Sequence, residues 1–262
     1  MRGNDTARIA PETNDAKRRI LNELWYNLLT AAAAARNTNM KRIALIAALI
    51  SLLISGCAKY PTSPTPITGK RLVITLTVAG EINPNYYYFV AFDISGQPTP
   101  GPLPVIAKPW GNGWGTGAIS SYVVYDQLQP QGGYGLYQIP PGTDLLGKVY
   151  VGPPISSVTP PTGSNKLQFT IDLGQLATDV IPVGSIDTIN INFITTNILP
   201  LSPDYSGPKY YDGLGDTGTS YITISAKTNQ RYSNSLNNIE NEGDCPIPDL
   251  DIIDWSVEVQ GY

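Results

Sequence analysis

The feature that most constrains the fold of this chain is a period-two alternation of apolar and polar residues that recurs after residue 69. Successive side chains of a β-strand point to opposite faces of a sheet, so such alternation buries one face and exposes the other. The clearest series begin at Leu72, Leu167, Ile189 and Ile253. Further β-branched and aromatic runs, bounded by Gly, Pro or Asn, cover residues 86–93, 120–125, 145–151 and 221–225.

These runs predict an all-β fold. About eight or nine short strands separated by Pro/Gly-rich loops are typical of an antiparallel β-sandwich, either immunoglobulin-like or jelly-roll-like. No second linker interrupts residues 70–262, so we expect one domain there. The loops at 95–117 and 198–219 are long, and long loops tend to carry function. Any site is therefore expected in these two loops.

Two stretches of the predicted sandwich resemble a known family. YYYFVAFDI (residues 86–94) and LQFTIDLGQL (residues 167–176) are similar to the aromatic strand and the later strand-plus-corner of carbohydrate-binding module family 9 and DOMON-like domains. The resemblance implies an extracytoplasmic β-sandwich. No ligand-binding residue of that family is matched in this chain, so the resemblance places no site.

Residues 40–57 predict a processing signal. Met40-Lys41-Arg42 precedes thirteen uncharged residues, 43–55. A membrane-spanning helix needs ~20 apolar residues, so this run fits the apolar region of a signal peptide better. It ends in LISGC (residues 53–57), which resembles the lipobox of bacterial lipoproteins. The resemblance implies diacylglycerol on Cys57, cleavage before Cys57 and N-acylation of the new terminus. A signal anchor with a coincidental cysteine is the alternative.

The lipobox resemblance also implies how the rest of the N-terminal region is divided. Residues 57–69 are expected to form the lipidated cysteine and a Pro/Ser/Thr-rich tether, after a signal peptide at 40–56. Ala58, rather than Asp, follows the cysteine, which favours the outer membrane or cell surface of a bacterial envelope. Residues 1–39 are either a short cytoplasmic extension or upstream of a true start at Met40, and we favour the second interpretation.

Charge and composition exclude several function classes. Residues 58–262 hold nine Lys/Arg and seventeen Asp/Glu, a net charge of −8, which argues against nucleic acid as a partner. The chain has no histidine and only two cysteines, Cys57 and Cys245. This composition excludes a histidine general base, a His-activated nucleophile and the common zinc sites. We predict a protein that is not an enzyme and has no organic cofactor; a carboxylate-dependent hydrolase is the less favoured alternative.

The stretch PWGNGWGTG (residues 109–117) is the first candidate site. Trp110 and Trp114 on a glycine-rich loop could present flat apolar faces to sugar rings, with Asn112 available to hydrogen-bond hydroxyl groups. The alternative is that both indoles fold back as a lid over the core.

The stretch DYSGPKYYDGLGDTGTS (residues 204–220) is the second candidate. Asp204, Asp212 and Asp216 offer the hard oxygen ligands that calcium prefers, although Asp and Gly are also what turns require. Asp249, Asp251 and Asp254 rank lower, because residues 251–260 are predicted to be a strand with an acidic outer face.

The sequence as a whole predicts a lipid-anchored envelope lipoprotein. Its membrane partner would be reached through the lipid on Cys57, and its β-sandwich would be a non-catalytic binding module for a glycan or polymer. The alternative is a structural or protein-interaction role in the envelope. Cys245 is expected to be a buried spectator, with intermolecular pairing as the second reading.

Overall fold

The computed structural model describes Asn27 and residues 69–97, 100–129 and 133–261. The predictions for residues 1–39, for the signal peptide at 40–56, and for lipidated Cys57 with its tether fall outside these described residues, Asn27 and Gly69 excepted. No helix in the described part of the chain is both long and apolar enough to cross a membrane.

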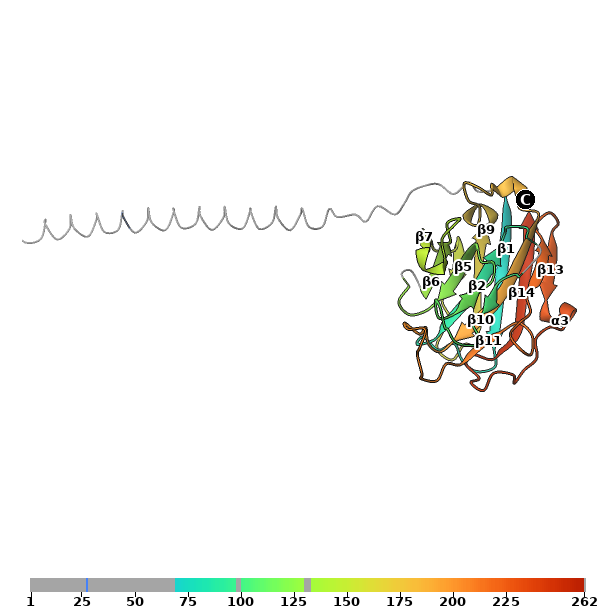
Figure 1. The fold of residues 1–262 in the computed structure, drawn as a ribbon. Coiled ribbons are helices and arrows are strands. Elements are labelled where there is room, and N and C mark those ends of the chain that lie inside the picture. Colours follow the sequence, from blue (N-terminus) through green and yellow to red (C-terminus); the bar gives the residue numbers. More distant parts are fainter. Residues whose placement is uncertain (1–26, 28–68, 98–99, 130–132, 262) are drawn as a thin grey trace, which may run out of the picture. The chain divides into compact units, whose positions relative to one another are not determined.

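All the paired strands of the described residues run antiparallel, which confirms the predicted all-β sandwich (Figure 1). The first main sheet has five strands in the order β13-β14-β1-β9-β8. Their bounds are Gln230–Ser233 (β13), Ile252–Gly261 (β14), Lys70–Val78 (β1), Lys166–Asp172 (β9) and Ser156–Val158 (β8).

The second main sheet follows the order β11-β10-β2-β5-β6-β7, and β12 also pairs with β10. The bounds are Tyr211–Gly213 (β11), Thr188–Thr196 (β10), Tyr87–Asp93 (β2), Ser121–Tyr125 (β5), Tyr134–Gln138 (β6), Val149–Gly152 (β7) and Ile222–Ser225 (β12). Outside the two sheets lie the pair β3 (Leu103–Pro104) and β4 (Gly115–Thr116), the 3₁₀ helices η1 (Leu145–Gly147), η2 (Leu173–Gln175) and η3 (Val183–Ser185), and the short helix α3 (Asn234–Asn237).

The main core lies between the two sheets and follows from the alternation in sequence. On β1, Leu72, Ile74 and Leu76 point inward and are buried. Across the core, Phe193 of β10 stacks on Trp255 of β14 with ring centroids 5.8 Å apart. The inward residues of these strands are apolar except for Thr195 of β10, whose Oγ1 donates to the carbonyl oxygen of Leu250. Burial of one sheet face against the other therefore supplies the main driving force for folding.

A second, smaller core lies on the outer face of the seven-stranded sheet. It contains Phe89 and Ala91 of β2, Tyr122 of β5 and Ile194 of β10, with Trp114 packed against them from the loop that includes β3 and β4. This sheet is therefore apolar on both faces. In the loop that includes β3 and β4, Trp114 covers part of this outer face.

One predicted strand was only partly correct. Residues 145–151 were expected to be extended, but residues 145–147 form η1 and β7 begins at Val149. The reason is the carboxylate of Asp144, which accepts the N–H groups of Leu146 and Gly147 and so turns the chain before the strand.

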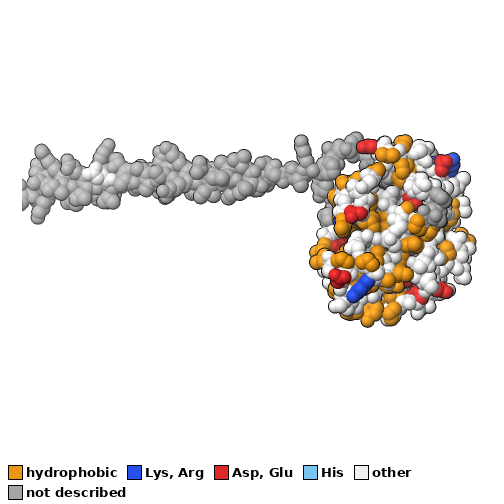
Figure 2. All heavy atoms as spheres, in the orientation of Figure 1, with side chains coloured by type: hydrophobic (Ala, Val, Ile, Leu, Met, Phe, Trp, Pro, Cys, Tyr) orange, Lys and Arg blue, Asp and Glu red, His pale blue; other side chains and the backbone are white. Residues whose placement is uncertain are grey.

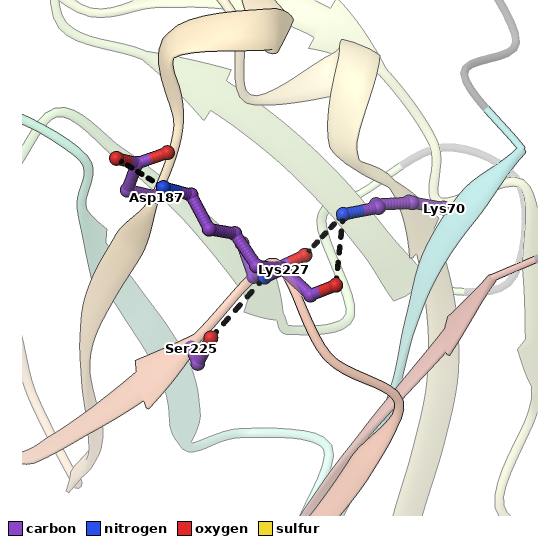
Figure 3. A network of polar contacts seen from close by, with 5 residues as sticks. Lys70, Asp187, Ser225 and Lys227 are labelled. Carbon is purple, nitrogen blue, oxygen red and sulfur yellow. Dashed lines mark hydrogen bonds and ion pairs between the residues drawn. The ribbon is translucent and has the colours of Figure 1, made fainter.

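Lys70 joins the two sheets at one end of the sandwich (Figure 3). Its Nζ donates to the carbonyl oxygens of Ala226, at 2.7 Å, and Lys227, at 3.4 Å, just after β12. Lys227 in turn forms a 2.7 Å ion pair with Asp187, which precedes β10. The start of β1 is thereby fixed to the far sheet.

Candidate functional site: an acidic hollow beside β11

The aromatic loop at 109–117 holds its indoles against the protein. Trp114 is 4% exposed and stacks on Phe89, and Tyr122 meets the same indole edge-on, with ring centroids 4.8 Å apart. Trp110 is 9% exposed, and its Nε1 donates to the carbonyl oxygen of Tyr205 at 3.1 Å. Both indoles are thus buried, Trp114 as a lid over the outer core and Trp110 against Tyr205 and Lys209 of the second long loop.

Asn112 is occupied by its own loop. Its Oδ1 accepts the N–H groups of Trp114 and Gly115, each at 2.9 Å, and its Nδ2 donates to the carbonyl oxygen of Gly115. The prediction that Trp110, Asn112 and Trp114 form an outward-facing binding platform is therefore corrected: the indole faces are packed on other side chains, and the amide closes a turn.

The second long loop forms a hollow of about 200 Å³ at the edge strand β11. Its wall includes Tyr210 and Tyr211 together with the carboxylates of Asp212, Asp216 and Asp244. Tyr210 is 38% exposed. Apolar rings and oxygen acceptors therefore meet at one place on the surface.

Asp212 is the buried residue of this hollow. It lies on β11 opposite Thr195 of β10, where Oδ1 accepts the N–H of Gly213 and Oδ2 accepts that of Ile252, both at 2.7 Å. Asp212 and Ile252 are 40 positions apart in sequence, so the carboxylate ties β11 to the first residue of β14.

Asp251 and Asp244 come from the loop that leads into β14. Asp251 is buried, and its carboxylate accepts the N–H groups of Gly243 and Cys245 at 2.9–3.2 Å. Asp244, between those two donors, is exposed. Its carboxylate and those of Asp212 and Asp251 place one oxygen each within 4.8 Å of one another. The fold thus assembles three carboxylates that are far apart in sequence.

Glu240 is a fourth acidic group in this region. It is 3% exposed, and its Oε2 accepts the N–H of Gly215 at 2.8 Å. Its Oε1 is buried and has no hydrogen-bond partner. Of the charged groups around Glu240, Asp212 acts most strongly on its carboxyl group.

Burial and mutual repulsion make these carboxyl groups hard to ionise. Burial, followed by the charges of Asp244 and Asp251, raises the pKa of Asp212 to about 7. Burial and the charge of Asp212 raise the pKa of Glu240 to about 9. Partial desolvation and the contact with Asp251 raise the pKa of Asp244, although its side chain is exposed on one side, to about 6. Each shift has the sign expected for acids that lack a neutralising cation.

Lys209 also lines the hollow but does not neutralise it. Its Nζ donates to the carbonyl oxygen of Val105 at 2.5 Å and lies over two rings, 4.7 Å from the centroid of Trp110 and 4.8 Å from that of Tyr211. Burial lowers its pKa to about 8. Lys209 thus connects the buried aromatic loop to the hollow.

The predicted calcium ligands are only partly brought together. Asp212 and Asp216 line the same hollow, but exposed Asp204 does not, and Asp216 accepts a hydrogen bond from Asn241 at 2.7 Å. The residues that group with Asp212 are instead Asp244 and Asp251. No sequence pattern singles out Asp244, and Asp251 was expected on an exposed strand face. No linear spacing links these residues, so only the strand pairing could have identified them.

Two other acidic residues that the sequence singled out, Asp249 and Asp254, do not line the hollow. Asp249 accepts the N–H of Glu81 at 3.0 Å, which fixes the chain after β1, and Asp254 is exposed on β14. Cys245 is a free, buried thiol whose pKa burial raises to about 11, as expected for an unreactive spectator.

Surface charge is sparse over the view in Figure 2, where acidic and basic side chains lie scattered among apolar and uncharged ones. Comparison of the chain with protein-family models, with curated proteins and with solved structures found no match in any of the three.

Proposed function

We propose that this protein is a lipid-anchored component of the bacterial cell envelope whose β-sandwich is a non-catalytic binding module for a glycan or a similar hydroxyl-rich polymer. The anchor rests on the signal peptide and lipobox of residues 40–57. The binding function rests on one observation, the hollow beside β11.

This hollow combines the two kinds of group that a hydroxyl-rich ligand needs. The exposed ring of Tyr210 and the half-buried ring of Tyr211 offer apolar faces, while Asp212, Asp216 and Asp244 offer acceptors for hydroxyl groups. Binding sites commonly pair an apolar surface with a few fixed polar groups in this way.

The hydrogen bonds of the two buried carboxylates hold them in position. Both oxygens of Asp212 and both oxygens of Asp251 accept backbone N–H groups. A carboxylate held in this way is fixed in position, which suits a recognition site.

The test is a glycan array probed with the purified full chain in detergent, beside a Tyr210→Ala variant. The Tyr210 ring is exposed, and its backbone bonds to Asn197 do not need the ring, so this variant should fold. We expect the wild type to bind a glycan class that Tyr210→Ala loses. Leu201→Ala, a fully exposed site in the same loop, should keep binding. A folded wild type that binds no glycan would reject the proposal.

A second candidate, a protein-interaction role, is favoured by a different observation. β7 and β8 are the end strands of their sheets, and Leu146, Val149, Ile155 and Val158 on or beside them are exposed. Edge strands with exposed apolar side chains readily pair with another chain. Loss of a co-purifying envelope protein from a Val149→Lys/Val158→Lys variant, but not from Tyr210→Ala, would support this role over glycan binding.

A further inference from the structure

We propose that the binding site continues from the hollow beside β11 into a second hollow at the same end of the sandwich, so that one hydroxyl-rich polymer chain spans both. The second hollow has a volume of about 350 Å³. This inference rests on the proposed function and deepens it, because it makes the ligand a chain of several units rather than a single sugar.

The register of the seven-stranded sheet aligns the two hollows. Asp212 of the first hollow pairs with Thr195 of β10, and Thr195 pairs with Tyr88 of β2. Tyr88 in turn pairs with Tyr125 of β5, which lines the second hollow. The four residues therefore form one row across β11, β10, β2 and β5 (Figure 1). Because neighbouring strands lie about 4.8 Å apart, the two ends of this row are about 14 Å apart.

The segment that leads into β14 bridges the two ends of the row. Three hydrogen bonds fix residues 249–252 to it: Tyr88 Oη to the carbonyl oxygen of Asp249 (3.0 Å), Thr195 Oγ1 to that of Leu250 (2.6 Å) and the N–H of Ile252 to Oδ2 of Asp212 (2.7 Å). Asp249 lines the second hollow, and Asp212 lines the first. The bonds therefore hold the two hollows at a fixed separation, as a preorganised site requires.

The second hollow offers the same two kinds of group as the first. Its apolar surface comes from three rigid prolines, Pro84, Pro160 and Pro161. Its wall also includes half-buried Tyr125 and exposed Thr162, and neither hydroxyl group has a hydrogen-bond partner among the described residues. Hydroxyl groups can both donate and accept, so these two are available to a hydroxyl-rich ligand.

The sizes of the hollows also favour a shared ligand. The hollow beside β11 holds about 200 Å³, which is below the range of about 300–1,000 Å³ that ligand pockets usually have. The two hollows together fall within that range. A single sugar ring is much shorter than the separation of the hollows, so a ligand that fills both is a chain.

The experiment measures how affinity depends on chain length. The purified full chain, in a detergent without a sugar headgroup, is tested on an array of cellulose, chitin, mannan and dextran oligomers, each as a series from monomer to octamer. Titration calorimetry then gives the affinity for each length of the series that binds. We expect the octamer to bind about tenfold or more tightly than the shortest oligomer that binds, because the second contact is made within one complex.

Tyr125→Phe/Thr162→Ala removes the two hydroxyl groups of the second hollow. The ring of Tyr125 is kept, and the turn bond from the N–H of Ser164 to the carbonyl oxygen of Pro161 does not need the Thr162 side chain, so this variant should fold. It should bind the shortest oligomer as the wild type does and lose about fivefold or more in octamer affinity. Thr159→Ala, an exposed threonine of the same hairpin that does not line the hollow, is the matched control and should keep the full gain.

The outcomes separate this proposal from the function on which it rests. Tyr210→Ala, in the first hollow, should lose binding at every length. A wild type that gains no affinity with length, or a Tyr125→Phe/Thr162→Ala variant that keeps the whole gain, would overturn the second hollow and leave the glycan-binding function in place. No binding at any length by a wild type with a cooperative unfolding transition would overturn both together.

Discussion

Trp114 lies face to face on Phe89, with ring centroids 4.1 Å apart and an interplanar angle of 3°. The contact closes the small core on the outer face of the seven-stranded sheet, where Tyr122 packs against the same indole. The sequence leaves this loop open between a binding platform and a lid over the core, and the packing of Trp114 shows that the loop stabilises the sandwich.

Replacing Trp114 by alanine should destabilise the protein by about 3–5 kcal/mol, because the change removes a buried indole and leaves a cavity over Phe89. Urea unfolding followed by circular dichroism measures the effect. Leu201→Ala, at a fully exposed position, should stay within about 0.5 kcal/mol of the wild type. A Trp114→Ala protein as stable as that control would show that the indole is not part of a core.

The Lys70 contacts predict unequal roles for two lysines. Lys70→Met should cost about 1–3 kcal/mol, since the part-buried ammonium bonds the Ala226 carbonyl and links the sheets (Figure 3). Lys227→Met should cost less than about 1 kcal/mol, because its ion pair with Asp187 is largely exposed. Urea unfolding in low and in high salt compares the two, and only the Lys227 effect should shrink with salt. A larger loss of stability in Lys227→Met than in Lys70→Met would contradict the role of Lys70 in linking the two sheets.

The strands that could be predicted from the sequence are the long ones. The long strands β1, β9, β10 and β14 were predicted because alternation directly reports which residues face the core, as at Leu72 and Val257. The short strands β8, β11 and β13 were not, because three or four residues carry too little periodicity and pair only through tertiary context.

The site was harder to predict for a related reason. Asp251 was assigned to an exposed strand face, yet β14 begins one residue later, and the N–H groups of Gly243 and Cys245 hold the Asp251 carboxylate inside. Which way an indole or a carboxylate points next to a strand depends on its neighbours in space, and Asp212 meets its neighbours only after β11 has paired with β10.

The raised pKa of Glu240 predicts how stability depends on pH. Its folded pKa is about 9, against an ordinary value of 4.5, so between these values the folded chain keeps a proton that the unfolded chain releases. The free energy of unfolding should therefore fall as pH rises through this window. Glu240→Gln cannot titrate, so in EDTA its stability advantage over the wild type should grow from near zero at pH 5 to about 1–3 kcal/mol at pH 8.

Urea unfolding at pH 5, 6, 7 and 8 measures this difference. Glu242→Gln is the matched control, because it changes an exposed carboxylate two residues away and keeps Glu240, so it should retain the wild-type fall in stability as pH rises. A Glu240→Gln advantage that is constant or shrinks as pH rises would contradict the assignment of a protonated, buried carboxyl group.

The lipobox resemblance predicts that Cys57, and not Cys245, carries lipid. Expression of the full gene in a bacterium with a labelled fatty acid should label the wild type and Cys245→Ser but not Cys57→Ser. Mass spectrometry of the labelled protein should find an N-terminal peptide that begins at Cys57 with two or three acyl chains, enough for stable anchoring, whereas one chain gives only reversible binding. Label that survives Cys57→Ser, or a mature chain that still contains residues 40–56, would exclude the lipoprotein assignment and leave the signal-anchor alternative, in which the apolar run itself holds the sandwich at the membrane.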